Sequence, residues 1–184
     1  MTEPQPISAL REKSWSGVPS SPGVYWWYFP RVELDRLQVA EFCDVYRLQL
    51  RLAPDGKVCL YHGMANNLSE RVKWHAAQKL TLNCLQSGFL STFRLTLLAL
   101  NDFDYLGGSS QIDDFMDHLS ISWQVVDSRH EAETLERSDL QGLYHYPLNI
   151  QGNLRPELAT FVRHLKSKRS DYKRRFTKLI NQLT

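Results

Sequence analysis

The feature that most constrains the fold of this chain is a β-hairpin in its first half. Residues 45–53 (VYRLQLRLA) alternate apolar and polar side chains, and residues 57–65 (KVCLYHGMA) form a second run typical of a strand. Pro54, Asp55 and Gly56 between them are turn-forming residues, because proline presets φ and glycine accepts positive φ. Two such runs joined by a short turn pair antiparallel. The sequence therefore predicts a sheet with at least one antiparallel pair.

Three further segments have the composition of strands. Residues 24–29 (VYWWYF) are rich in β-branched and aromatic residues, follow a Ser-Ser-Pro-Gly turn and stop at Pro30. Residues 91–100 (STFRLTLLAL) and 121–128 (ISWQVVDS) are expected to form two more strands.

Helices are expected between and after these strands. Asn67 and Glu70 are three residues apart, as in a capping box, and open a helix over residues 67–78. Pro156 suits the first turn of another helix, where its missing N–H costs nothing. The other segments with helical character are residues 7–13, 31–42, 109–118, 131–143 and 155–184, the last as one or two helices.

These elements predict an α+β fold, in which a small mixed or antiparallel β-sheet is flanked by helices. We expect an N-terminal arm (residues 1–19), one domain (residues 20–150) and a basic helical C-terminal tail (residues 151–184). A chain of 184 residues is long enough for one such domain with a helical appendage.

The composition excludes several classes of protein. Three cysteines, an odd number without a Cys-x-x-Cys pair, argue against a disulfide framework or a zinc ribbon and fit a reducing cytoplasm. No apolar run reaches the roughly 18 residues of a membrane span, so no membrane association is expected. The N-terminal residues lack the apolar run of a signal peptide. A cytoplasmic location is the expectation that follows.

Basic residues are concentrated toward the C-terminal end. From Arg155 onward nine Lys and Arg residues oppose two acidic residues, which gives +7, whereas the rest of the chain carries −5. A basic tail on a mildly acidic body is typical of proteins that bind polyanions. A solvated helix face would explain the same charges, so both interpretations stay open on charge alone.

Six polar residues are candidates for chemistry, although each has an ordinary structural explanation by itself. Arg71 and His75 are four residues apart, so they share one face of their predicted helix. Glu136 stands mid-helix between Ala132 and Leu140, an unusual apolar setting for a carboxylate. The remaining candidates are Tyr25, Tyr61 and Asn149.

Taken together, the candidates form an ordered pattern. Gly23-Val24-Tyr25 in PGVYWWYF and Tyr61-His62-Gly63 in CLYHGMANNLSERVKWH are similar to the two halves of the GIY-YIG nuclease signature. Asn67-Leu68 and Arg71 follow at the family's spacing. Downstream, ISWQVVDS resembles the family's third strand, EAETLE its catalytic-glutamate helix, and Pro147–Asn149 the residues that close the domain.

The resemblance covers residues 22–149 and implies a GIY-YIG-like nuclease domain with two helical insertions, at about residues 31–55 and 101–118. The first insertion accounts for the separation of 36 positions between Tyr25 and Tyr61.

Two details refine the resemblance. The Arg71-x-x-x-His75 arrangement is most similar to the restriction-endonuclease branch. His62 stands where the family usually has isoleucine. Because neighbouring side chains of a strand alternate between faces, His62 should point away from Tyr61 and Gly63 and need not touch the chemistry.

The resemblance implies metal-dependent hydrolysis of DNA phosphodiester bonds. Glu136 would hold Mg²⁺, or Mn²⁺ as a substitute, with waters and phosphate oxygens as the other ligands. Glu133, one turn earlier, is a rival ligand, but Glu136 lies closer to the family's distance from Asn149. Arg71 would clamp the scissile phosphate near the N-terminus of its helix.

One of the two tyrosines would take the proton from the attacking water. We expect Tyr25 to be this base and Tyr61 to orient the water or a phosphate oxygen. An unperturbed tyrosine has a pKa near ~10, so the base needs help from a neighbour such as His75. Asn149 would position Glu136 or its helix.

The implied substrate is double-stranded DNA. The expected function is a restriction- or defence-type endonuclease. The alternatives are a structure-specific repair or recombination nuclease and a GIY-YIG-like binding module without turnover. Since one chain has one site, cutting both strands would take two visits or a homodimer. The residues expected to bind DNA are Arg71, Lys73, Arg163, Lys166, Arg169, Lys173 and Arg174.

Overall fold

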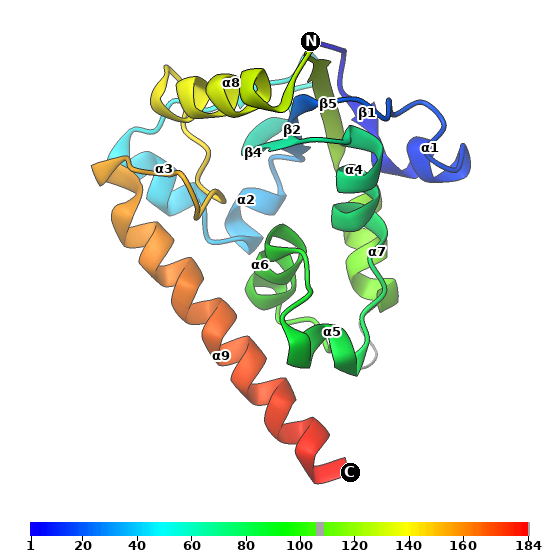
Figure 1. The fold of residues 1–184 in the computed structure, drawn as a ribbon. Coiled ribbons are helices and arrows are strands. Elements are labelled where there is room, and N and C mark those ends of the chain that lie inside the picture. The colour runs from blue at the N-terminus through cyan, green and yellow to red at the C-terminus, as the bar shows by residue number, and fades with distance from the viewer. Residues whose placement is uncertain (106–108, 184) are drawn as a thin grey trace.

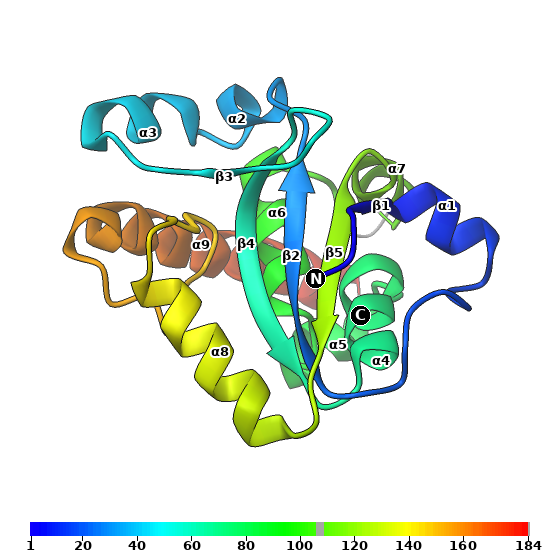
Figure 2. The same cartoon turned by 90° about the horizontal axis from the view of Figure 1, so that it is seen from above.

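A five-stranded antiparallel sheet runs through the molecule (Figures 1 and 2). The computed structural model describes residues 1–105 and 109–183, and in them the strand order is β1-β5-β2-β4-β3. All neighbouring strands are antiparallel. The strands are β1 (Gln5–Pro6), β2 (Gly23–Phe29), β3 (Arg51–Leu52), β4 (Val58–Ala65) and β5 (Ser120–Val125).

Helices surround this sheet, which confirms the predicted α+β class. α8 (Arg129–Gln141) covers one face of the sheet, and α6 (Thr92–Asn101) lies on the other (Figure 1). α9 (Ala159–Leu183) packs along α6. The other helices in the described residues are α1 (Ile7–Glu12), α2 (Glu33–Arg36), α3 (Ala40–Tyr46), α4 (Leu68–Ala77), α5 (Leu82–Ser87), α7 (Ser109–Asp117) and a 3₁₀ turn at Pro156–Leu158.

β2 contributes to two hydrophobic cores, because all seven of its residues are buried. Successive side chains of a strand point to opposite faces. The odd-numbered residues from Tyr25 to Phe29 enter the larger core with α4 and α6, and the even-numbered ones from Val24 to Tyr28 enter the smaller core with α8. This alternation places Tyr25 on the same side of the sheet as α4.

α6 (Thr92–Asn101) occupies the segment where residues 91–100 were predicted to form a strand, so that prediction is wrong. Ser91 begins the helix, where its Oγ accepts a hydrogen bond from the backbone N–H of Arg94. Every residue from Phe93 to Leu100 is buried, because α6 packs against both the main core and α9. A helix covered on all sides has no polar stripe, and its apolar run looks like that of a buried strand.

The predicted hairpin is shorter than expected. β3 comprises only Arg51–Leu52, because the start of the strand predicted over residues 45–53 belongs to α3 and the segment that follows it. The turn itself agrees with the prediction, since Gly56 has a φ of +82°. The helix predicted over residues 31–42 is divided between α2 and α3.

The arm and the second insertion agree with the predicted elements, with one addition. β1 pairs with β5, and α1 occupies the predicted helical turn at residues 7–13. α7 lies within the predicted helix at residues 109–118, whereas residues 106–108 of that insertion lie outside the described residues. α5 was not predicted.

The C-terminal segment forms one long helix, α9, preceded by the turn that begins at Pro156. Leu165, Tyr172 and Phe176 are buried along one side of α9. Tyr172 also donates a hydrogen bond to the carbonyl of Phe103 at 2.8 Å. The basic residues of α9 are therefore carried by a helix that is packed onto the domain. Among the described residues, no helix is long and apolar enough to cross a membrane.

Candidate active site

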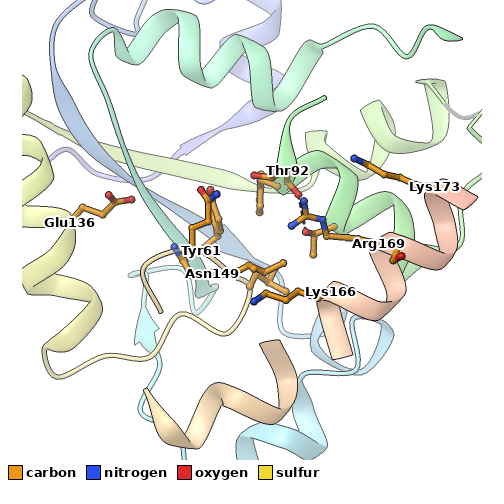
Figure 3. Close-up of a pocket in the computed structure, with 13 residues that line it drawn as sticks. Tyr61, Thr92, Glu136, Asn149, Lys166, Arg169 and Lys173 are labelled. Carbon is orange, nitrogen blue, oxygen red and sulfur yellow. Dashed lines mark hydrogen bonds between the residues drawn. The ribbon is translucent and has the colours of Figure 1, made fainter. Parts of the chain in front are cut away.

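A cleft of about 690 Å³ opens between α8 and α9 (Figure 3). Tyr61 reaches it from β4, Glu136 from α8 and Thr92 from the start of α6. The wall formed by α9 carries three basic residues, Lys166, Arg169 and Lys173. A carboxylate, a phenol and several cations from separate elements thus meet in one place.

The two candidate tyrosines are neighbours, but only one of them lines the cleft. Their ring centroids are 6.4 Å apart. Tyr61 lines the cleft, whereas Tyr25 is only 2% exposed. Burial raises the pKa of Tyr61 to about 12, with Glu136 adding to the rise and Arg71 opposing it. Burial also raises the pKa of Tyr25 well above its usual value, and Tyr61 adds to this rise.

Gly63 makes room for Tyr25. The two residues are cross-strand partners in the pairing of β2 with β4. A Cβ atom on residue 63 would lie 2.5 Å from Oη and 2.7 Å from Cζ of Tyr25. The tyrosine ring can lie across β4 only because the residue beneath it has no side chain.

His75 supports Tyr25 from within the core. Its Nε2 is 2.8 Å from the Tyr25 hydroxyl, and its Nδ1 is 2.6 Å from Oγ of Ser91. Burial, with the charges of Arg71 and Arg94, lowers the pKa of His75 well below its usual value, so the ring is neutral. Since His75 is 2% exposed, its ring is enclosed in the core, where it contacts Tyr25 and Ser91.

Ser91 completes this hydrogen-bonded chain and was not among the sequence candidates. The predicted strand over residues 91–100 concealed it. A serine before an apolar run is also typical of a helix N-cap, and this was the signal available in the sequence.

Arg71 lies in the first turns of α4 and faces a second, smaller cavity of about 260 Å³. Its guanidinium carbon is 4.8 Å from the ring centre of Trp74. The Arg71 charge opposes the rise in pKa that burial causes at Tyr61 and at Glu136. Arg71 therefore lies within electrostatic range of both groups of the cleft.

Glu136 is directed toward the cleft (Figure 3). Burial raises the pKa of its carboxyl group, while a hydrogen bond from the Met64 backbone and the charge of Arg71 act in the opposite direction. The rival, Glu133, has a side chain that is 40% exposed and forms an ion pair with Arg129 at 2.7 Å. Of the two carboxylates, Glu136 is the one that lines the cleft.

The donors of the cleft fit a divalent ion that brings most of its own ligands. Within residues 1–105 and 109–183, no group of three or more His, Cys, Asp or Glu side chains could hold a metal ion. Mg²⁺ is commonly bound through one or two carboxylates and substrate phosphates and keeps several waters. Glu136 could hold such an ion together with a phosphate, whereas an enclosed metal centre does not fit.

Asn149 holds β4 and not α8. Its side-chain N–H donates to the carbonyl of His62 at 2.7 Å, and its Oδ1 accepts from the His62 backbone N–H at 2.9 Å. The neighbouring Leu148 donates its backbone N–H to Leu60 at 3.0 Å. The expectation that Asn149 positions Glu136 or its helix is thus corrected, because its contacts are with the strand that carries Tyr61.

His62 points to the opposite face of the sheet, as expected. Its ring stacks on Trp26 with a centroid distance of 4.9 Å, and burial lowers its pKa to about 4. The residue that replaces isoleucine is therefore part of the smaller core.

Most of the chain also matches a known protein family. A family model described as the GIY-YIG catalytic domain matches residues 23–171. The chain belongs to the GIY-YIG family. A GIY-YIG domain implies a nuclease-type function with DNA as the substrate. No curated protein and no solved structure gives a significant match.

The GIY-YIG match reaches into α9 and includes part of the basic wall of the cleft. Lys166, Arg169 and Lys173 are spaced by three and four residues, so they lie on one face of the helix. Burial lowers the pKa of Arg169, and the nearby Tyr61 opposes this shift. Arg169 is thus the α9 cation that interacts electrostatically with Tyr61.

Three other predicted DNA-binding residues of this GIY-YIG domain lie outside the cleft. Arg163 hydrogen-bonds to Thr160, and Arg174 forms an ion pair with Asp171 at 2.6 Å. Lys73 is exposed on α4. The structure therefore separates these residues from the cations that surround Tyr61.

Proposed function

We propose that this GIY-YIG protein is an endonuclease that hydrolyses DNA phosphodiester bonds with a divalent ion, Mg²⁺ or Mn²⁺, held at Glu136. The observation that carries the proposal is the meeting of Tyr61, Glu136 and three α9 cations in one cleft. The cations would bind the phosphates of a DNA strand by releasing its counterions. When bound, the ion supplies stabilisation of the charge that develops on the phosphate and the leaving oxygen.

Tyr61 is a better candidate for the general base than Tyr25. A base must come within hydrogen-bond reach of the water, directly or through one further water. Tyr61 lines the cleft, whereas Tyr25 is covered by the core. The earlier interpretation of Tyr25 as the base is therefore replaced in this proposal.

The hydrogen bonds behind Tyr61 support this assignment. Oγ of Ser91 already accepts a hydrogen bond from the backbone N–H of Arg94, so the Ser91 hydroxyl can donate its own hydrogen bond to Nδ1 of His75. Neutral His75 then carries its proton on Nε2, next to the Tyr25 hydroxyl. Tyr25 in turn can donate to Tyr61, which stabilises the phenolate form of Tyr61.

Arg71 and Arg169 would hold the phosphate that is cut. Both are cations whose charge favours the ionised form of Tyr61. One guanidinium group can bind two phosphate oxygens at once, which restricts the orientation of the phosphate.

DNA cleavage should depend on a divalent ion, whereas DNA binding should not. We expect products from plasmid or branched oligonucleotides with Mg²⁺, no products with EDTA, and recovery with Mn²⁺. Binding should persist in EDTA, because the α9 cations do not need the ion. Undiminished cleavage in EDTA would contradict the proposal, and binding without cleavage of any substrate would indicate a binding module.

The positions of the cut ends would distinguish the biological classes. Discrete plasmid fragments would support a restriction- or defence-type enzyme that acts on double-stranded DNA. Cuts at branch points would support a repair or recombination nuclease. Cleavage of both strands in one encounter would indicate a homodimer.

The rate of the chemical step should increase with pH. Since burial raises the pKa of Tyr61 to about 12, its phenolate fraction is small at neutral pH and grows by about tenfold per pH unit. Single-turnover cleavage measured between pH 6.5 and 9 should follow this slope. Toward lower pH the rate should fall further as Glu136 is protonated, because burial raises the pKa of that carboxyl group. A flat profile would assign the base to another group.

A further inference from the structure

An exposed aromatic side chain lies close to Arg71. Phe89, in the segment between α5 and α6, is 68% exposed. Its ring centroid is 5.9 Å from that of Trp74 on α4. The ring of Trp74 also carries the guanidinium of Arg71. Phe89 and Trp74 form one cluster, called here the aromatic platform, in which Arg71 covers one face of the half-buried Trp74 and Phe89 is the exposed ring.

Contacts of the neighbouring backbone hold Phe89 in its exposed position. The side chain of Gln78 donates to the Phe89 carbonyl at 2.7 Å and accepts the backbone N–H of Ser91 at 2.8 Å. The next residue, Leu90, is buried in the main core. The backbone on both sides of Phe89 is therefore anchored, and the phenyl ring is held outside the core.

The platform is connected to the active site at both ends. Ser91, two residues after Phe89, bonds to His75 in the chain that leads to Tyr25. At the other end, Arg71 and Trp74 line the same small cavity. A strand whose phosphate is held by Arg71 would therefore bring a neighbouring nucleoside toward the aromatic rings.

Positive charge accompanies the platform. Arg71 lies over the ring of Trp74, and two lysines nearby in the sequence, Lys73 and Lys79, are exposed. Glu70, which lines the small cavity, is the acidic exception. Aromatic rings combined with cations are the features that bind a single nucleic-acid strand, in which bases stack on the rings and phosphates contact the cations.

We propose that Phe89, supported by Trp74, stacks an unpaired base of the DNA strand that is cut, so that DNA with a flap, gap or single-stranded branch is the preferred substrate. This inference rests on the proposed function. In an intact duplex both faces of each base are covered by neighbouring pairs. The platform can therefore engage only a base that is already unstacked, or one that binding must first unstack at a cost.

The test compares two DNAs that differ only in pairing. The probes are an oligonucleotide flap with 2-aminopurine beside the branch and the fully paired duplex of the same sequence. Binding is measured in the Glu136→Gln background, which prevents cleavage. The variants are Phe89→Ala, Phe89→Trp and, as a matched control, Val32→Ala, which removes an equally exposed apolar side chain next to α2.

We expect Phe89→Ala to weaken binding of the flap by about 5- to 150-fold, the range for loss of one base–aromatic stack. It should leave binding of the duplex within about twofold and abolish quenching of the 2-aminopurine. Phe89→Trp should retain both properties, and Val32→Ala should change neither. Equal losses on both DNAs, or no loss on the flap, would overturn the inference.

The outcome is separable from that of the proposed function. If the wild-type protein cleaves DNA and Phe89→Ala does not change binding of the flap, the proposed role of the platform is refuted and the proposed nuclease function is retained. If the wild-type protein cleaves no DNA but Phe89→Ala weakens binding of the flap alone, base stacking on the platform is supported and the proposed nuclease function is refuted.

Discussion

Glu136→Gln should reduce DNA cleavage by roughly 1,000-fold, because the side chain keeps its shape but loses the charge that holds a divalent ion. The carboxylate lines the cleft beside Tyr61, and burial already raises its pKa. A neutral amide at this position avoids the cost of burying a charged carboxylate. The thermal unfolding temperature of Glu136→Gln should therefore equal or exceed that of the wild-type protein. Cleavage is measured in single turnover with Mg²⁺, and DNA binding in EDTA.

Glu133→Gln is the matched control for this prediction. Glu133 lies one turn earlier on α8, where its side chain pairs with Arg129 near the surface. This variant should retain cleavage to within a factor of about two, since exposed ion pairs contribute little. The opposite pattern, with loss in Glu133→Gln and activity in Glu136→Gln, would make Glu133 the metal ligand.

Gly63→Ala should lower cleavage by about 100-fold, a loss that a misplacement of about 1 Å near the reacting groups can cause. The new methyl group would lie 2.5 Å from the Tyr25 hydroxyl, so the ring must move. This movement breaks the hydrogen bond of Tyr25 to His75 and removes the support behind Tyr61. Single-turnover cleavage measures the loss, and circular dichroism shows whether the fold is intact.

Gly17→Ala serves as the control for Gly63→Ala. A Cβ atom on residue 17 would meet Leu10 at 3.7 Å, which is an ordinary contact. Its cleavage rate should equal that of the wild-type protein. Full activity in Gly63→Ala would show that the position of Tyr25 is not important for the reaction.

Local signals in the sequence predicted the elements that hold most of the site. The capping box at Asn67 and Glu70 begins α4, and the side chain of Asn67 accepts the N–H of Glu70 as predicted. The aromatic run of β2 and the helix that carries Glu136 were also predicted correctly. In each case a few adjacent residues determine the conformation, so a single sequence suffices.

α6 could not be predicted in the same way. Its conformation depends on burial against both the core and α9, and α9 lies far along the chain. A buried helix and a buried strand are equally apolar, so the pattern does not distinguish them. The error removed Ser91 from the candidates and with it the group that binds His75.

Contacts between distant residues limited the prediction of the site in a second way. Asn149 binds the backbone of His62, 87 residues earlier, and no local pattern indicates this pair. Likewise, the charge of the tail did not distinguish Arg169, which lines the cleft, from Arg163, which does not. The distinction depends on which side of α9 is buried.

The position of α9 in the chain bears on when the protein becomes active during its synthesis. Tyr25, Tyr61 and Glu136 precede α9, yet the cationic wall of their cleft is made by Lys166, Arg169 and Lys173. Because a chain is synthesised from its N-terminus, the proposed chemical groups emerge from the ribosome before the three α9 cations of the cleft. If the α9 cations bind DNA as proposed, an unfinished chain lacks this wall of the cleft, and we expect it to cleave polynucleotides only after α9 has packed on α6.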